Sequence, residues 1–486
     1  MDDAKRTDLF ENKPIIVAVL AMALPSIIGQ IILVIYNMAD TLFVGLTENH
    51  ILINAVTICM PAYMILTAIS NLFGVGGSSV IARSLGKGNE KRARRASSFA
   101  FWGCLLVSLI YCAIIAIFAE NIAHMLGAND AETINHAAYY LRIAVAICGV
   151  PTAINTLFSH LIRSQGLGFH ASFGIALGGI LNVALDPLFI FVICGKENAA
   201  VGAALATGIS NVIALLYYVF VFIFLRKKLI VDISFTKKIF KDHLIQEVLL
   251  IGLPACLMTL FENISYAILG NQMGALSAEA LTGVEVAKKV NMFAHNAVRG
   301  MAQGVLPLIG YNKSSGNRRR MRKIVYTSGA ISLGIALVAM IINMIPFTGR
   351  GLISLFLHGG VENLEIRQNY AYWFLFIFSI GAPFSAIAYT VISFFQAVGK
   401  AWRSLILALL RKGILDIPLM FILQALATMD FKPYSITMAT PIADIICCLV
   451  AVILFAVYIK YHGHNKKDLN MEQDITPIDN VVQLSE

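Results

Sequence analysis

Charged residues are scarce in this sequence of 486 residues, because Asp, Glu, Lys and Arg together make up only 13% of the chain. Soluble domains carry about a quarter charged and about half apolar residues. Here the hydrophobic fraction is 58% and the mean hydropathy is +0.76. A chain with so little charge has too few polar side chains to cover a water-facing surface, so we do not expect a soluble fold.

Motifs that signal catalysis or cofactor binding are absent as well. The sequence has no HExxH, GxSxG or Walker-type GxxxxGK[ST] pattern, and the glycine-rich stretch at 74–88 lacks the spacing of the last one. The eight cysteines all lie in apolar segments without CxxC or zinc-type His/Cys spacing. We therefore predict packing roles for the cysteines, no cofactor and no enzymatic activity.

Long apolar runs are what the sequence has in abundance. Twelve runs approach or exceed the roughly 20 residues that cross a bilayer as a helix. The first begins near Pro14, behind the acidic Asp2 and Asp3, which indicates a retained span rather than a cleaved signal peptide. The predicted spans are 15–45, 51–82, 97–119, 136–162, 169–194, 199–225, 244–273, 278–309, 324–346, 367–397, 402–427 and 436–459.

The distribution of basic residues explains the net charge of +9. Most of the 37 Lys and Arg residues lie before the first span, in the even-numbered connections or after the last span. The odd-numbered connections hold four, namely Lys196, Arg350, Arg367 and Lys432. By the positive-inside rule, this asymmetry predicts a multi-pass protein of the inner (plasma) membrane with both termini in the cytoplasm. The basic clusters are then topology signals, and no nucleic-acid partner is expected.

The chain also contains an internal repeat. Leu24-Pro25 recurs as Leu253-Pro254 at an offset of 229 residues, and each repeat holds six spans. An even number of spans returns the chain to the same side, so the halves are parallel repeats with a cavity between them. The predicted fold is an all-α integral membrane protein with twelve transmembrane helices in two parallel-repeat six-helix bundles. The predicted divisions are a cytoplasmic tail at 1–13, a first lobe at 14–232, a second lobe at 233–465 and a disordered cytoplasmic tail at 466–486.

Acidic residues inside spans are the most informative feature, because an ionised side chain there costs at least ~2.5–3.5 kcal/mol and needs a partner, a cavity or a proton. On the first helix, Asp40 follows Tyr36 by four residues and Asn37 by three, which places all three on one face. The six acids are Asp40, Asp186, Glu262, Glu285, Asp416 and Asp444.

The fifth span repeats this geometry with Asn182 and Asp186, and Pro187 then leaves a carbonyl of the preceding turn without its helical donor. Hard cations prefer oxygen ligands, so we predict a coupling site for Na+ or for an exchangeable proton. Asn155 and Thr207 either complete this site or form hydrogen bonds between helices, and spacing leaves both open. The predicted coupling residues are Asp40, Asn155, Asn182, Asp186 and Thr207, with Na+ expected at Asp40, Asn182 and Asp186.

The acids of the second half have basic neighbours in helical register. Glu285 precedes Lys288 by three residues, and Lys412 precedes Asp416 by four, so intrahelical ion pairs are predicted. Asp444 has no charged partner in register, and its role is open.

Glu262 lies between Met258 and Tyr266 at spacings of four, a mixture that predicts a lining for organic cations. His295 is either a polar packing group or a proton relay. The predicted substrate cavity consists of Tyr36, Asn37, Tyr139, Met258, Glu262, Tyr266, Lys289 and His295.

In this order along the chain, five stretches resemble the multidrug and toxic compound extrusion (MATE) transporters of bacterial type. They are YNMADTLFVG at 36–45, GVGGSSVIARSLGKGN at 74–89, NVALDPLFI at 182–190, GAALATGIS at 202–210 and GVLPLIGYN at 304–312. The likeness extends from Pro25 to about Lys460. It implies an antiporter that expels organic compounds while Na+ or protons run inward.

The resemblance also implies site positions. Family members build a first-lobe cation site at positions that match the five predicted coupling residues, with Tyr139 or Tyr140 nearby. Some members instead use a second-lobe glutamate, at the position of Glu262, together with an aspartate on the tenth helix. The tenth span here has no acid. We therefore expect no complete second-lobe cation site, and Glu262 to serve the substrate.

Together these features predict a monomeric secondary antiporter for multidrug efflux, with a small, often cationic, organic substrate. Two alternatives stay open. A flippase for lipid-linked saccharides would share the architecture but needs a strongly cationic cavity for pyrophosphate. The candidates for such a cavity are only Lys288, Lys289, Arg299 and Arg142. An intramembrane enzyme would need a catalytic constellation that the sequence does not show.

Overall fold

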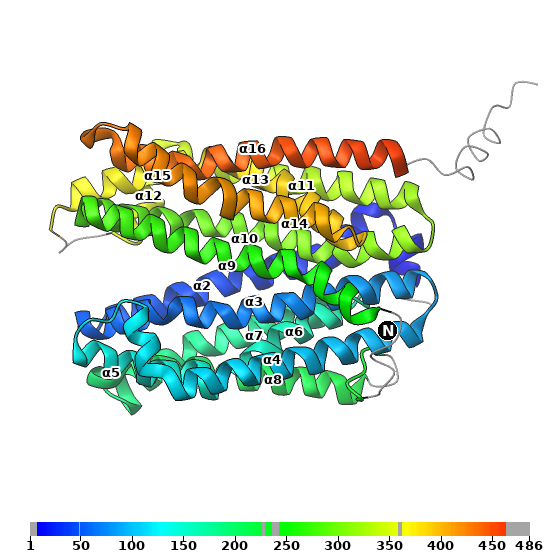
Figure 1. Cartoon of the computed structure of the whole chain (residues 1–486), viewed down its shortest axis with the longest axis horizontal. Helices are drawn as coiled ribbons and strands as arrows, with labels where there is room; N and C mark the ends of the chain where they lie inside the picture. Colours follow the sequence, from blue (N-terminus) through cyan, green and yellow to red (C-terminus); the bar gives the residue numbers. More distant parts are fainter. Residues whose placement is uncertain (1–6, 48, 226–228, 236–242, 358–361, 463–486) are drawn as a thin grey trace, which may run out of the picture.

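The computed structural model describes residues 7–47, 49–225, 229–235, 243–357 and 362–462, and this part of the chain is helical without strands. The predicted tail at 466–486 lies outside the described residues. Figure 1 shows two bundles side by side, with the first half of the chain in one and the second half in the other. Two lobes therefore form in the order that the repeat predicts.

The first lobe contains six spans. Its fourth span is bent by 47° between Ala131–Ile147 and Gly149–Arg163. The elements are α2 (Ile15–Gly45), α3 (His50–Gly86), α4 (Glu90–Met125), α5 (Ala131–Tyr140), η2 (Leu141–Ile147), α6 (Gly149–Arg163), α7 (Gly168–Pro187), η3 (Leu188–Ile193), η4 (Lys196–Asn198) and α8 (Ala199–Phe224).

The second lobe repeats this arrangement with six spans and two short connecting helices. The eleventh span of the chain is interrupted by the π-helical segment η6, which ends at Asp416, two residues before Pro418. The elements are α9 (Leu244–Leu276), α10 (Ala278–Ser314), α11 (Arg318–Met344), α12 (Pro346–Ser354), α13 (Leu364–Ala397), α14 (Ala401–Leu409), η6 (Leu410–Asp416), α15 (Ile417–Leu426), η7 (Met429–Phe431) and α16 (Lys432–His462).

Polar residues are concentrated inside the lobes. Within the described chain, nine helices are long and apolar enough to cross a membrane, and the bent fourth span makes a tenth. The other two spans are α10, which carries Arg299, and the interrupted span of α14, η6 and α15, which carries Arg411 and Lys412. In contrast, large apolar side chains such as Ile117 and Phe224 are 71% and 70% exposed. The outer surface is thus suited to lipid and the interior holds the charge.

A short π-helix, η1 (Asp8–Asn12), precedes the first span and packs against the second lobe. Phe10 is fully buried, with its ring centroid 4.8 Å from that of Tyr311. The Arg320 guanidinium donates to the carbonyl oxygens of Phe10 at 2.8 Å and Lys13 at 2.6 Å. The described part of the segment expected as an N-terminal tail is therefore held against the opposite lobe.

The two lobes meet closely at the end of the molecule that carries the basic loops. A Cβ atom on Gly76 would overlap the Val248 carbonyl of α9, and one on Gly252 would overlap the Leu72 carbonyl of α3. Backbone therefore meets backbone at this contact.

Polar contacts between the lobes lie at the same end. Asn71 donates to Thr259 at 3.0 Å, and the Ser79 hydroxyl donates to the Gln396 carbonyl at 2.6 Å. Glu247 forms ion pairs with Arg83 at 2.6 Å and with Arg92 at 2.5 Å. Among the described residues, the hydrogen bonds and ion pairs that join the lobes thus close one end of the space between them.

Candidate functional site

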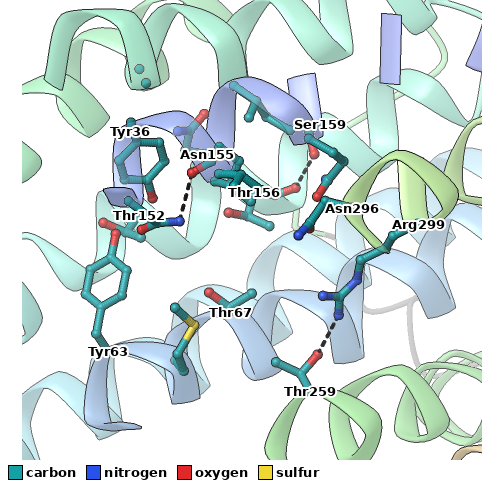
Figure 2. Close-up of a pocket in the computed structure, with 18 of the residues that line it drawn as sticks. Tyr36, Tyr63, Thr67, Thr152, Asn155, Thr156, Ser159, Thr259, Asn296 and Arg299 are labelled. Carbon is teal, nitrogen blue, oxygen red and sulfur yellow. Dashed lines mark hydrogen bonds between the residues drawn. The ribbon is translucent and has the colours of Figure 1, made fainter. Parts of the chain in front are cut away.

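A cavity of about 190 Å³ lies between the lobes, lined by α2, α3, α6, α7 and α8 on one side and by α9 and α10 on the other. Figure 2 shows its wall, with Asn296 and Arg299 reaching it from the second lobe. Its aromatic side chains are tyrosines, with no Phe or Trp among the described lining residues. Nine carboxamides line it, namely Gln30, Asn37, Asn71, Asn155, Asn182, Asn211, Asn263, Asn296 and Gln303. The wall therefore combines many hydrogen-bonding side chains with apolar ones such as Leu33, Val34 and Met292.

The structure brings five of the predicted cavity residues together and places three elsewhere. Met258 lines a smaller adjoining cavity, and Lys289 is among the lining residues of neither. Tyr139 is 48% exposed on the outside of α5, whereas Tyr140 is 3% exposed, because one residue turns about 100° around a helix. The five residues that line the central cavity are Tyr36, Asn37, Glu262, Tyr266 and His295.

The two first-lobe acids lie next to each other beside this cavity. Asp40 on α2 is 7% exposed, and Asp186 at the end of α7 is fully buried. The Asn182 amide donates to Asp186 Oδ1 at 3.4 Å and to Thr207 Oγ1 at 3.2 Å, and Asp40 contacts all three residues. Gly179 allows this approach, since a Cβ there would lie 2.9 Å from a methyl group on α2. We call Asp40, Asn182, Asp186 and Thr207 the first-lobe acid cluster.

Several buried oxygen atoms at this site have no hydrogen-bond donor among the described residues. They are Asp40 Oδ1, Asn155 Oδ1, Asn182 Oδ1 and Asp186 Oδ2. Nor does any Lys or Arg of the described chain form an ion pair with either acid. Buried acceptors ordinarily have a donor or a cation, and a set of hard oxygens fits Na+ or a proton.

The two residues whose role the sequence leaves open take different positions. Thr207 belongs to the first-lobe acid cluster through its contact with Asn182. Asn155 donates from α6 to Asn211 Oδ1 on α8 at 3.1 Å, so it links two helices. Its free oxygen faces the same region of the cavity wall. Both residues therefore form hydrogen bonds between helices, and their part in ion coupling stays a prediction.

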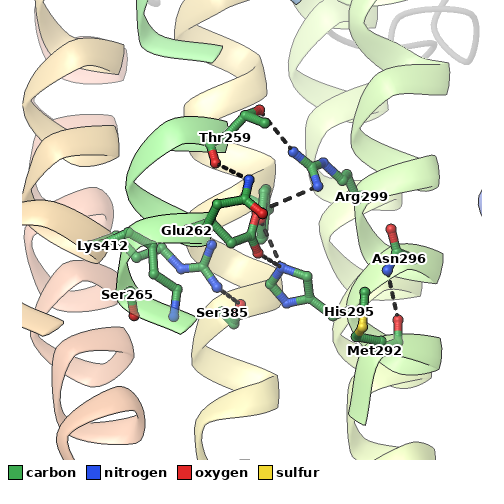
Figure 3. Close-up of polar contacts among 12 residues, drawn as sticks. Thr259, Glu262, Ser265, Met292, His295, Asn296, Arg299, Ser385 and Lys412 are labelled. Atoms are coloured by element: carbon green, nitrogen blue, oxygen red, sulfur yellow. Dashed lines mark hydrogen bonds and ion pairs between the residues drawn. The ribbon is translucent and has the colours of Figure 1, made fainter. Parts of the chain in front are cut away.

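In the second lobe, Glu262 is neutralised by cationic and hydrogen-bonding groups from α10 (Figure 3). Glu262 Oε1 lies 3.0 Å from His295 Nε2, and Glu262 Oε2 lies 3.5 Å from the Arg299 guanidinium. The Tyr389 hydroxyl lies 2.9 Å from the same His295 nitrogen. His295 thus takes part in a polar network that spans three helices.

The other second-lobe acids are paired at shorter distances. Asp444 Oδ1 accepts from Arg411 Nε at 2.6 Å, and both side chains are almost completely buried. Asp416 accepts from Lys412 at 2.9 Å, and from the hydroxyls of Ser265 and Thr440. The predicted Lys412 pair forms, and Asp444 gains a partner that its own helix does not supply.

The predicted organic-cation lining around Glu262 stays a prediction, with Glu262 and Tyr266 in the central cavity. Glu262 is already neutralised, and Met258 lies in the adjoining cavity. The Tyr266 ring lies under two ammonium groups of the protein, with Lys288 at 5.2 Å and Lys412 at 5.4 Å from its centroid. Lys288 also forms the predicted ion pair with Glu285, at 2.6 Å. A substrate cation would therefore find neither a free acid nor a free aromatic face here.

Sequence reasoning missed the residues that connect helices across the site. Arg411 is fully buried beside Asp444, and its guanidinium lies 4.4 Å from the ring centroid of Tyr389. Arg411 directly precedes Lys412 within an apolar span, and a second charge at such a position is the signal that identifies it. Amides such as Asn211 and Asn263 give no comparable signal, because single amides are common in membrane helices.

The fold and site together define a two-lobed membrane transporter. A profile of the MatE family matches residues 25–188 and 254–422, and the two matches begin 229 residues apart, the offset of the internal repeat. The chain therefore belongs to the MATE family of transporters, and its fold of twelve spans in two repeated bundles is the family fold. Members of this family are transporters rather than enzymes.

Similar proteins of known sequence and structure cover nearly the whole chain. The multidrug export protein MepA of Staphylococcus saprophyticus is 28% identical over 447 residues, which are 92% of this chain and 94% of MepA. MepA of Staphylococcus aureus is equally similar.

Two solved structures share the fold. An outward-facing multidrug resistance MATE transporter of the MOP superfamily has a TM-score of 0.83 at 22% identity, with 94% of this chain and 98% of that chain covered. A MOP superfamily transporter from Pyrococcus furiosus, described by the reverse polarity of its binding pocket, has a TM-score of 0.82 at 22% identity, with 95% and 99% covered.

Proposed function

We propose that this protein is a secondary antiporter that exports small organic compounds across the plasma membrane, driven by inward flow of Na+ or H+. The observation that carries the proposal is the buried pair of Asp40 and Asp186 beside a cavity between two lobes, in which Asp40 Oδ1 and Asp186 Oδ2 have no donor among the described residues. The MepA relatives are multidrug export proteins, which supports export as the direction. A single chain contains both lobes and the site, so the transporter works as a monomer.

Coupling requires that the ion and the substrate favour different states or exclude each other, because a ligand with equal affinity for two states shifts nothing. Asn182 belongs to the first-lobe acid cluster and also lines the central cavity. Tyr36 lies on the same α2 face as Asp40 and lines the cavity too. An ion at the cluster therefore changes the side chains that a substrate would contact.

The direction of opening follows from the lobe contacts. The lobes are joined at the end that carries the basic loops, by the Glu247 ion pairs and by Asn71. By the positive-inside rule this end is cytoplasmic, as are both termini. In this proposal the contacts close the cavity on the cytoplasmic side, and alternating access would require them to separate.

The test is efflux of the fluorescent cation ethidium from proteoliposomes under separately imposed Na+ and proton gradients. Asp40→Asn and Asp186→Asn should each lower gradient-driven efflux at least about tenfold, because the carboxylate that binds the ion is lost. The matched control is Asp130→Asn, at an exposed position where the side chain caps α5 by accepting from the Thr133 amide. Asn caps helices as well as Asp does, so this variant should transport normally.

The gradient that drives efflux identifies the ion. Normal gradient dependence in both first-lobe variants would place coupling elsewhere, and Glu262→Gln would be tested next. If neither ethidium nor any other soluble organic probe moves under either gradient, export of small organic compounds is the wrong function. Movement of a short-chain lipid-linked saccharide would then favour the flippase.

A further inference from the structure

The space beside the central cavity contains an arginine whose charge the mechanism above does not use. Arg163 ends α6 and is 2% exposed, and its Nε and Nη1 groups have no acceptor among the described residues. It lines the smaller cavity that adjoins the central one. An unpaired buried charge is costly, so a side chain of this kind needs a partner that the described protein does not supply.

Arg299 lies on the boundary between the two cavities and is only loosely held. Its guanidinium is 3.5 Å from Glu262 and 3.4 Å from the Thr259 hydroxyl, both near the upper limit for a hydrogen bond. Arg299, His160 and Gln303 line both cavities. The two spaces therefore form one region, and we call the smaller cavity, which both Arg163 and Arg299 line, its floor.

The charge balance of this region is positive. Among the described residues that line the two cavities, Glu262 is the only acid, whereas Arg163 and Arg299 are both cationic. Glu262 is also contacted by His295, so no acid there is left for a substrate cation. Guanidinium groups with free N–H donors bind carboxylates and phosphates with charge-assisted hydrogen bonds.

The rest of the wall indicates what the remainder of the substrate looks like. Nine carboxamides lie among the described lining residues of the central cavity, and eight of them already donate a hydrogen bond to another protein group. Each amide nitrogen carries two N–H groups, and the oxygens of Asn155 and Asn182 have no donor among the described residues, so hydrogen-bonding groups remain for a substrate. A solute rich in hydroxyl or amide groups would satisfy them.

We infer that the preferred substrate is a hydrophilic organic molecule that carries one oxyanion, with the anion held at the cavity floor between Arg163 and Arg299. The inference rests on the proposed transport function and specifies its substrate class. The oxyanion is a carboxylate or a phosphate, which both arginines recognise in the same way.

The experiment compares probes that differ in the anion alone, in proteoliposomes of the full chain under each of the two gradients. One pair is N-acetyl-alanyl-alanine and its C-terminal amide, and the other is uridine monophosphate and uridine. Ethidium is the lipophilic cation. The anionic member of at least one pair should leave at least about tenfold faster than its neutral twin, a difference equivalent to about 1.4 kcal/mol. The pair that shows the preference tells whether the oxyanion is a carboxylate or a phosphate.

Arg299→Gln should abolish the preference and raise ethidium efflux severalfold, because Glu262 loses its guanidinium partner. Arg142→Gln is the matched control, since Arg142 pairs with Glu120 on the exposed surface. The comparison of each anionic probe with its neutral counterpart in the unmodified protein tests the substrate preference even if Arg299→Gln does not fold. If ethidium moves and neither pair shows a preference, the inference is wrong while the antiporter stands. If no probe moves under either gradient, the transport function itself fails, and the inference with it.

Discussion

The two lobes share a repeated architecture but treat their buried acids in opposite ways. In the first lobe, Asp40 and Asp186 lie together without a Lys or Arg partner among the described residues. In the second lobe, Asp444 and Asp416 each accept from a buried cation at 2.6 and 2.9 Å, and Glu262 lies between His295 and Arg299. The first lobe therefore leaves its two acids without a protein cation among the described residues, and the second lobe supplies cations for its own acids.

This difference shows that duplication of a fold does not duplicate a site. The π-helical segments η3 and η6 both lie next to a proline in a span that carries a buried aspartate. In the second lobe, Arg411 and Lys412 precede that aspartate within the same span. These two basic residues form buried ion pairs with Asp444 and Asp416.

The largest effect should come from removing a protein cation in the second lobe. Arg411→Met leaves Asp444 buried and unpaired, and breaking a buried pair in this way costs about 3–5 kcal/mol. The free energy of unfolding, measured by denaturant titration of the purified protein in detergent, should fall by this amount. Arg411→Met combined with Asp444→Leu should recover most of the loss. A double variant as unstable as the single one would mean that the pair is not the reason.

The corresponding change in the first lobe should have the opposite sign. Asp186→Asn removes a buried charge that has no protein cation beside it and keeps an oxygen that can accept from Asn182. The free energy of unfolding should stay constant or rise by about 1–3 kcal/mol, since a buried charge is replaced by a neutral amide. The same titration checks this, in Na+-free buffer. A loss as large as that of Arg411→Met would contradict the contrast between the lobes.

A smaller effect is expected where the lobes meet. Glu247→Gln weakens the ion pairs with Arg83 and Arg92. The exposed fractions of the three side chains are 26% for Glu247, 15% for Arg83 and 22% for Arg92. Partly exposed pairs contribute up to about 1 kcal/mol, so the lobes should separate severalfold more often at this end. A Ser79→Cys reporter, buried between the lobes, should then react faster with a maleimide. Glu120→Gln, at an exposed pair, should leave the rate unchanged.

The smallest effect should come from the surface. Arg142→Gln removes an ion pair with Glu120 at 3.0 Å, with side chains 39% and 62% exposed. Exposed pairs contribute about 0–1 kcal/mol, so the free energy of unfolding should change by less than about 0.5 kcal/mol. This variant sets the baseline against which both lobes are compared.

The sequence predicts the local parts of this site and misses the parts that join distant helices. Asn182 with Asp186, and Lys412 with Asp416, are spaced by one helical turn, so the 3.6-residue period identifies them. Arg411 and Asp444 are 33 residues apart on different helices, and no periodicity connects them. Their contact depends on how the helices pack.

The same limit explains the errors in the cavity. Tyr139 was predicted to line the cavity, but it is exposed and the next residue, Tyr140, is the buried one. The π-helix η2 begins directly after Tyr140. Met258 and Tyr266 share a face of α9 with Glu262, but only Tyr266 reaches the central cavity. The twelve spans were predictable, because lipid requires long apolar helices whichever side chains meet inside.

Backbone contact between the lobes has a further consequence. Where Gly76 and Gly252 bring α3 and α9 together, a larger residue would interfere only while the lobes touch, and would be harmless once they part. Such positions act on one half of the transport cycle alone. In the proposed transport cycle, a single methyl group there would change how long the transporter rests in each state, without any change to the residues proposed to bind ion or substrate.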